Sequence, residues 1–340
     1  MSNSRKILIG AVVSAIIVCA GASFGSTNIR VYDTLRIILE KILPIPLTEG
    51  IDPREVSIVW LLRLPRVLLA FIVGGSLAMS GAVVQSILKN QLASPFILGV
   101  SSGASLGAAL VMLTGFAIPL AGGLTLPAAG FFFGLFTVYI VISFSAKLDK
   151  TMSNNTIILF GMVFTLFVNA LLTTLMALFR EELKNLITWQ MGSFALKGWS
   201  YVRAMIPFFI IGTLGIIRYT KEMDILTFGD DQAKSVGVET EKVRKWLFVF
   251  STILTGAAVS LSGTIGFVDL IAPHVARRFV GSNHRYVIPM SFVLGGSLTV
   301  VTDLIARTIV SPSELPVGAI TALIGAPFFA WVYFRKRQAA

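Results

Sequence analysis

The sequence predicts an all-α, polytopic membrane protein of about ten transmembrane helices, with short cytoplasmic helices in one loop. Three observations support this fold class. Of the 340 residues, 55% are hydrophobic and only 13% are charged, and runs without Asp, Glu, Lys or Arg recur along the chain. The charged share is about half that of an ordinary soluble domain. Lipid is therefore the expected solvent for much of the apolar surface.

The uncharged runs define the predicted spans, because a helix needs about 20 mainly apolar residues to cross a bilayer. Nine spans follow from hydropathy. The stretch 270–280 is shorter and more charged, and it is counted as a tenth, short helix sheltered by its neighbours, with nine spans as the alternative. The predicted spans are residues 7–25, 57–85, 92–112, 121–146, 154–179, 199–220, 245–266, 270–280, 286–306 and 315–334, all in a single membrane domain over 1–340.

Two of these runs need comment. The run 90–146 is long enough for two spans, and the Gly- and Pro-containing segment 115–123 supplies the turn between them. The first run resembles a secretory signal peptide, because Arg5 and Lys6 precede it and Ala20-Gly21-Ala22 lies near its end. Its apolar run is longer than a usual signal peptide has, and retaining it makes the number of spans even. We therefore expect it to remain as a span.

The net charge of +11 is divided unequally between the two sides of the predicted membrane domain. With the N-terminus in the cytoplasm, most of the 28 Lys and Arg residues fall at inner ends, and the outer excess is small. This distribution follows the positive-inside rule, so both termini are predicted to be cytoplasmic in a bacterial cell membrane. The same distribution removes the main reason to expect a nucleic-acid partner.

Two connections between spans are long. On the outside, residues 28–56 carry apolar residues at helical spacing from Val31 to Ile42, which predicts an amphipathic helix lying on the membrane. On the inside, residues 222–245 are too charged to span. They predict two short helices, from Asp230 to Val236 and from about Glu239, separated by Gly237. The pattern fits an ordinary loop and a docking element equally well.

The sequence lacks most of the motifs on which enzymes and metal sites depend. The chain has one cysteine, Cys19, and two histidines, His274 and His284, too few for a disulfide framework or a zinc or iron–sulfur cluster. Neither a suitable nucleophile motif nor a phosphate-binding Gly-x-x-x-x-Gly-Lys-Ser/Thr loop occurs. The chain is therefore expected to be no enzyme and to bind no cofactor itself. If ATP and Mg are used, another chain must bind them.

An ion-coupled secondary transporter is an alternative from a different class. Such carriers usually place ionisable groups near the middle of the membrane. The candidates are Asp269, at the start of the short tenth helix, and Asp303, four residues before Arg307. An Asp and an Arg at this spacing more often neutralise each other than relay a proton, and charges within the spans are sparse. Both facts argue against ion coupling.

Several motifs together resemble the permease subunits of ABC importers for iron–siderophores, haem and cobalamin, the FecCD type. The resemblance covers about residues 7–335. The stretches that carry it are Leu62-Arg63-Leu64-Pro65-Arg66, Gly81 to Gln85, Asn90 to Pro95, Leu98 to Ala104, Gly263 to His274 with Arg277, Glu314 to Gly318, and Gly325-Ala326-Pro327. Two positions depart from the family pattern, which commonly has Pro at Gln91 and Gly at Asp269. The second departure places a carboxylate in a helix–helix contact.

The resemblance implies a ten-span permease that pairs with a second, identical or homologous permease, with the translocation path between them. Two cytoplasmic ATPase subunits would dock on the loop 222–245, and ATP-driven closure would tilt the spans. The residues implied in ATPase coupling are Asp230, Asp231, Gln232, Ala233, Val236, Gly237 and Val238. A helix-packing or path-lining role is expected for Gly81, Gln85, Gly99, Gly103, Gly107 and Pro273, and packing is the simpler reading because small residues let helices approach closely.

On the outer side, the resemblance implies docking of a substrate-binding protein whose acidic residues meet Arg63, Arg66 and Arg307. Arginines at helix ends also serve only as anchors that reach the interface. The expected function is ATP-driven import of a ferric siderophore, with cobalamin or haem as alternative cargoes. The ion-coupled secondary transporter remains the alternative from another class.

Overall fold

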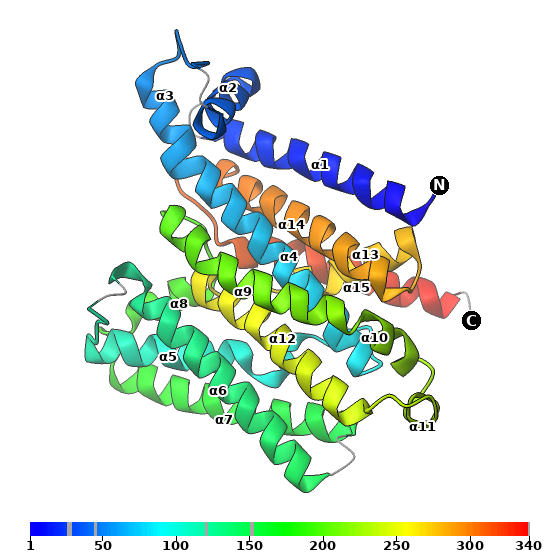
Figure 1. The fold of residues 1–340 in the computed structure, drawn as a ribbon. Helices are drawn as coiled ribbons and strands as arrows, with labels where there is room; N and C mark the ends of the chain where they lie inside the picture. The colour runs from blue at the N-terminus through cyan, green and yellow to red at the C-terminus, as the bar shows by residue number, and fades with distance from the viewer. Residues whose placement is uncertain (26–28, 44–45, 120–121, 150–152, 339–340) are drawn as a thin grey trace.

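The computed structural model describes residues 1–25, 29–43, 46–119, 122–149 and 153–338, and within them it contains helices and no strand (Figure 1). The long helices form a bundle, and short helices lie at its two ends. The α-helices are α1 (Asn3–Ser23), α2 (Val31–Ile42), α3 (Pro53–Ser57), α4 (Leu64–Ile87), α5 (Val100–Thr114), α6 (Thr125–Leu148), α7 (Asn154–Leu178), α8 (Lys184–Gln190), α9 (Trp199–Arg218), α10 (Thr220–Leu226), α11 (Asp230–Ser235), α12 (Thr240–Ser262), α13 (Val268–Val280), α14 (His284–Thr308) and α15 (Val317–Gln338).

Among the described residues, seven helical segments are long and apolar enough to cross a membrane, and α5 and α15 are shorter apolar helices. With the 13-residue α13, helices lie in each of the ten ranges predicted as spans. Both termini lie at the same end of the bundle as α10 and α11, whereas α2, α3 and α8 lie at the opposite end (Figure 1). We call these the inner and outer ends.

The second membrane segment is continuous from Pro53 to Ile87. Asp52 caps its start by accepting a hydrogen bond from the Arg54 backbone N–H at 2.8 Å, and Pro53 occupies the first turn, where no intrahelical partner for an N–H is needed. A π-helical stretch, Ile58–Arg63, joins α3 to α4. Such wide turns shift the face that the following helix presents.

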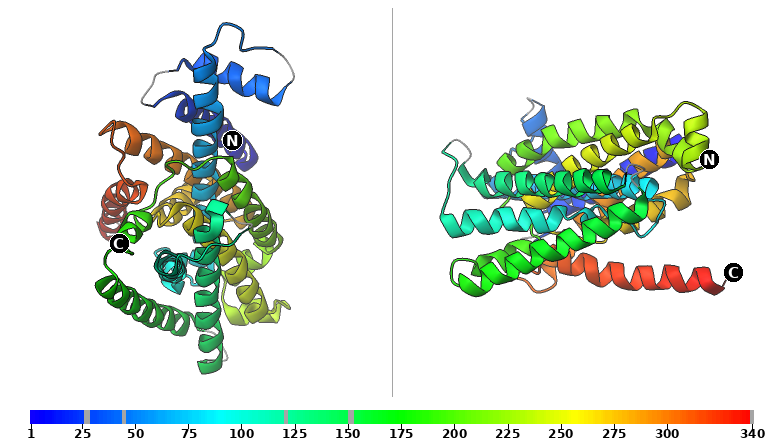
Figure 2. Two further views of the ribbon diagram at one scale, coloured as in Figure 1. Left: turned by 90° about the vertical axis from the view of Figure 1, so that its left-hand side faces the viewer. Right: turned by 90° about the horizontal axis from the view of Figure 1, so that it is seen from below.

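Helices α4 and α14 pack along their lengths at the centre of the fold, and α4 is buried over most of its length. Glycines bring the two backbones together. A Cβ on Gly74 would lie 2.5 Å from the Gly295 carbonyl oxygen, and a Cβ on Gly295 would overlap the side chain of Ala78. In contrast, α7 and α15 lie at the periphery (Figure 2), and the membrane segment of α7 exposes most of its residues. Gly74 and Ala78, one turn apart on α4, therefore form part of its contact with α14.

Several local features agree with the sequence and others differ from it. The outer amphipathic helix is confirmed as α2, and the two inner helices begin at Asp230 and Thr240. The sequence did not predict α8, or the separate helix α10, which follows a break at Tyr219. The third span begins with a short 3-10 turn, Pro95–Leu98, and Gly99 then takes the left-handed conformation (φ +81°) before α5.

Candidate functional site

At the inner end, residues 220–238 form a compact platform that contains α10 and α11 and connects α9 to α12. Met223, Leu226 and Ala233 are buried and attach it to the main hydrophobic core. The polar side chains of its helices therefore face either the ends of neighbouring spans or the aqueous side. The platform is an ordered element with its own buried contacts.

The first residue of α11, Asp230, is bound by two cations from different spans. Lys89, just beyond the end of α4, donates to its carboxylate at 2.9 Å, and Arg244 of α12 does so at 2.8 Å. Burial raises the pKa of Asp230, but the hydrogen bond from Lys89 and the charge of Arg244 outweigh burial, so its pKa lies below the usual value. The carboxylate therefore remains charged and paired at neutral pH.

A second carboxylate of the platform, Asp224 of α10, binds the first residue of α14. Its Oδ1 accepts the His284 backbone N–H at 2.9 Å and lies 2.5 Å from the His284 ring Nδ1. The backbone N–H is one of the groups at a helix start that has no partner inside the helix. Both residues line a polar pocket of about 610 Å³, together with Lys89 and Arg277.

The seven residues predicted for ATPase coupling occupy different environments. Asp231, Gln232, Val236 and Gly237 are exposed, whereas Asp230 and Val238 are partly buried. Ala233 is fully buried, so its side chain anchors α11 to the core, and any role in coupling would be exerted through the position of that helix. Adjacent side chains on this short helix face opposite environments, because Gln232 is exposed and Ala233 is buried, which the sequence pattern could not resolve.

Sequence reasoning missed Phe228, between α10 and α11. This side chain is 75% exposed, and Val236 at the other end of α11 is 67% exposed. Exposed apolar side chains rimmed by polar ones are common at protein contacts, so these two side chains make the platform a candidate contact surface. The signal available in the sequence was an aromatic residue within an otherwise charged loop.

Three of the predicted packing or path residues meet where α4 crosses α13. Pro273 has no N–H, so the Asp269 carbonyl one turn earlier lacks its normal helical donor. Gln85 replaces that donor, with Nε2 3.2 Å from the Asp269 oxygen, and its own Oε1 accepts from Arg277 at 2.6 Å. A Cβ on Gly81 would overlap the same carbonyl. The missing N–H of Pro273, the hydrogen bonds of Gln85 and the missing side chain of Gly81 together permit a close, hydrogen-bonded crossing of α4 and α13.

The unusual carboxylate Asp269 is completely buried at this crossing. One of its oxygens accepts a short hydrogen bond from Ser94, in the segment between α4 and α5. The other oxygen, Oδ1, has no hydrogen-bond partner among the described residues. The contact links α13 to the segment that contains Gln91, the other departure from the family pattern.

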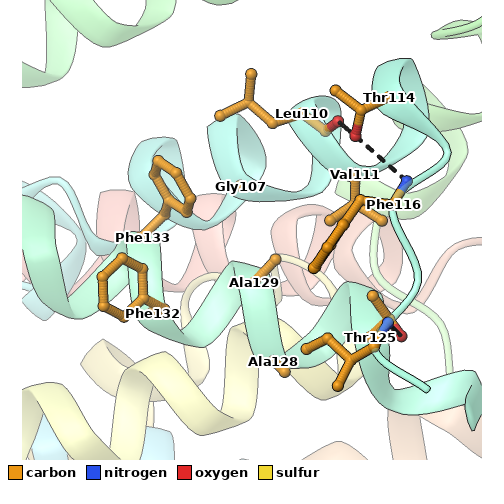
Figure 3. Close-up of a pocket in the computed structure, with 11 residues that line it drawn as sticks. Gly107, Leu110, Val111, Thr114, Phe116, Thr125, Ala128, Ala129, Phe132 and Phe133 are labelled. Carbon is orange, nitrogen blue, oxygen red and sulfur yellow. Dashed lines mark hydrogen bonds between the residues drawn. The ribbon is translucent and has the colours of Figure 1, made fainter. Parts of the chain in front are cut away.

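The glycines at positions 99, 103 and 107 hold α5 against α6. Cβ atoms on Gly103 and Gly107 would lie 2.7 Å from the Phe133 carbonyl oxygen and 2.6 Å from the Ala129 carbonyl oxygen. Gly107 also lines an apolar pocket of about 350 Å³ between the two helices, with Phe132 and Phe133 on its wall (Figure 3). The geometry supports helix packing for these glycines, because their open sides are filled by the neighbouring helix.

The three arginines predicted for docking come together at the outer end, where all three are largely buried. Arg66 binds Asp303 of α14 and Glu314 of the loop before α15, each at 2.8 Å. Arg63 donates to the Ser23 carbonyl at 2.5 Å. Arg307 donates to the Gly21 carbonyl and lies 3.7 Å from Asp303.

This arrangement gives the arginines internal partners that the sequence did not reveal. The hydrogen bond from Arg66, which outweighs partial burial, lowers the pKa of Glu314 below its usual value. The pairing of Asp303 with arginines agrees with local charge neutralisation rather than proton relay. Among the residues that the structure describes, no group of three or more His, Cys, Asp or Glu could hold a metal ion.

Comparison with known proteins supports the sequence resemblance over nearly the whole chain. The model of the FecCD transport family matches residues 12–335. An uncharacterized ABC transporter permease of Bacillus subtilis, YvrB, is 39% identical over 97% of this chain and 94% of its own length. The Fe(3+) dicitrate permease FecD of Escherichia coli is 36% identical over 81% of this chain and 84% of its own.

The fold has a close counterpart among solved structures. An inward-facing structure of an ABC transporter assigned to the metal-chelate type matches with a TM-score of 0.84 and 30% sequence identity. The match covers 98% of this chain and 99% of the chain in that structure. A full-length family match and relatives at this identity are sufficient to assign the family. The chain therefore belongs to the FecCD transport family and is an ABC transporter permease.

Proposed function

We propose that this permease is the membrane-spanning subunit of an ATP-driven importer that moves a ferric siderophore into the cell by alternating access. The observation that carries this proposal is the likeness, over nearly the whole chain, to an inward-facing transporter of the metal-chelate type. Membership of an ABC permease family also removes the support for an ion-coupled secondary transporter. The chain itself would leave its cargo chemically unchanged.

The platform is the proposed contact for two cytoplasmic ATPase subunits, which would bind ATP and Mg. The exposed side chains of Asp231, Gln232 and Val236, with the backbone at Gly237, would form the surface, and Phe228 would be its apolar anchor. A protruding surface of this kind transmits force from a partner only if it is attached firmly to the spans. Its buried contacts with the core support that role. Both chain termini would then be cytoplasmic.

The outer arginine network is the proposed receiver of a substrate-binding protein. Three arginines (Arg63, Arg66 and Arg307) surround two carboxylates (Asp303 and Glu314), so the network has a positive balance that suits an acidic partner. Because the guanidinium groups also hold the fold together, replacing them would disturb structure as well as docking. The docking role therefore needs a binding measurement on a variant that remains folded.

A second permease, identical or homologous, is the proposed partner within the membrane, with the translocation path between the two. Peripheral helices expose large apolar side chains, including Leu166 (68%) and Phe167 (63%) on α7 and Leu323 (72%) on α15. Lipid or a second permease can cover such faces. The glycines of α5 face α6 and so contribute to the path through packing.

Relatives with other cargoes provide a second candidate within the same class. A cobalamin permease of Halobacterium salinarum and a hemin permease of Yersinia pestis are 36% and 35% identical to this chain. Uptake of a radiolabelled ferric siderophore, cobalamin and haem should be compared in cells with and without the permease. We expect the deletion to abolish siderophore uptake alone. Loss of cobalamin or haem uptake with normal siderophore uptake would reassign the cargo.

A further inference from the structure

We propose that Asp224 and Asp230 are joints that transmit movement between the platform and the spans, rather than residues that touch the ATPase. This inference rests on the proposed function, because it assumes an ATPase on the platform. It concerns how binding at one end of the permease reaches the other. The evidence is the set of ion pairs and hydrogen bonds that leave the platform and the packing of the helices that receive them.

The Asp230 joint connects one platform helix to two spans. Of its partners, Lys89 follows the end of α4 and Arg244 lies near the start of α12, and the Arg244 side chain is only 4% exposed. An ion pair with a buried partner is poorly screened by solvent, and removal of one member leaves the other charge uncompensated. Any displacement of α11 must therefore move the ends of α4 and α12 or break these contacts.

The Asp224 joint connects the other platform helix to a third span. Its carboxylate holds both the backbone N–H and the ring of His284, whose side chain is 3% exposed. Because these bonds lie at the first residue of α14, they fix the helix where it starts. The two joints together attach the platform to the inner ends of α4, α12 and α14.

The receiving helices act as a rigid connection to the outer end. The glycine contacts between Gly74 and Gly295 lock α4 to α14 at mid-length. At the outer end the same pair is joined again by Arg66 and Asp303, at 2.8 Å. Two helices that are packed at mid-length and ion-paired at the outer end respond as one body, because close-packed interfaces do not deform gradually. The α4–α14 pair thus links the proposed docking ends.

A control pair joins the platform to the first turn of α12 at an exposed position. Lys234 and Glu241 form an exposed pair at 2.9 Å, with both side chains 53% exposed. Exposed pairs contribute little because solvent screens them. Removing the Glu241 charge takes one negative charge from the same end of the bundle, as removing the Asp224 charge does, but the contact that it cuts is exposed and involves no buried span residue.

The test uses the complete permease–ATPase complex in lipid nanodiscs, with and without substrate-loaded binding protein. The variants are Asp224→Asn, Asp230→Asn and the control Glu241→Gln. Co-purified ATPase and the stimulation of ATP hydrolysis by the binding protein are both measured. We expect both joint variants to retain the ATPase and to lose stimulation by about fivefold or more, the scale of a typical coupling energy. The control should retain stimulation.

Each other outcome has a separate meaning. Full stimulation in both joint variants would overturn the inference. Loss of bound ATPase in the joint variants would also overturn it, because these residues would then be docking contacts. If the unchanged permease binds no ATPase, or shows no stimulation, the proposed function fails, and the inference that rests on it fails with it; this outcome is recognised because it appears without any substitution.

A double-mutant cycle provides an independent readout for Asp230. Lys89 lies in the left-handed backbone region (φ +49°), which Asn tolerates better than most residues, so Lys89→Asn is the suitable partner substitution. If the two side chains act through their contact, stimulation in the double variant should fall no further than in Asp230→Asn alone. Multiplicative losses would show that the contact does not carry the coupling.

Discussion

The guanidinium of Arg66 binds two carboxylates that are far from it in the sequence, Asp303 of α14 and Glu314 in the loop before α15. Asp303, the more buried of the two carboxylates, is 1% exposed. Removing one member of a buried pair typically costs about 3–5 kcal/mol, because the other charge stays buried without compensation. Arg66→Gln should therefore lower the thermal unfolding midpoint of the detergent-solubilised permease strongly. Arg36→Gln, which removes a partly exposed pair with Asp33 at 3.8 Å, should change it little. Equal effects would contradict the structural role of Arg66.

The pairing of Glu314 with Arg66 predicts a specific pH dependence. The pKa of Glu314 is depressed in the folded protein, so the pair stabilises the fold at pH values above the unfolded pKa, about 4.3. This stabilisation is lost as the pH falls through the depressed pKa. The difference in unfolding midpoint between the natural chain and Glu314→Gln should be present at pH 7 and shrink below pH about 4. A difference independent of pH would contradict the ion pair.

At the scale of elements, the crossing of α4 and α13 depends on one missing side chain. A methyl group on Gly81 would overlap the Asp269 carbonyl, and backbone cannot move aside as a side chain can. Gly81→Ala should therefore separate the helices and cost at least about 1–3 kcal/mol, as overpacking does. Gly130→Ala is the control, because its methyl group would lie 3.4 Å from Ser260. Unfolding midpoints that fall equally in both variants would contradict the tight crossing.

The spans, the amphipathic outer helix and the inner short helices were predictable because each depends on local apolar or charge patterns. The residues at the α4–α13 crossing were identifiable as small or helix-breaking, but their meeting depends on how distant helices pack. The internal partners of Arg63, Arg66 and Arg307 were invisible for the same reason. Local spacing placed Asp303 beside Arg307, whereas the contact with Arg66 joins residues 237 positions apart.

The proposed orientation of the whole molecule places the platform in the cytoplasm and the segment beside α8 outside. The chain has a single cysteine, so a Cys19→Ser background gives a thiol-free protein. Cysteines introduced at Glu181, beside α8, and at Asp231, in the platform, are both at exposed positions. An impermeant maleimide should label the first in intact spheroplasts and the second only after permeabilisation. The reverse pattern would contradict cytoplasmic termini.

The α4–α14 pair, with its arginine network outside and its carboxylate joints inside, explains how one chain could serve partners on both sides of a membrane. In the proposed function, ATP bound to a partner subunit drives transport. The most direct test is uptake of a labelled ferric siderophore by proteoliposomes that contain the permease, its ATPase and the substrate-binding protein. We predict accumulation only when ATP and Mg are present on the ATPase side. Uptake without ATP, driven by a proton or sodium gradient, would contradict the account.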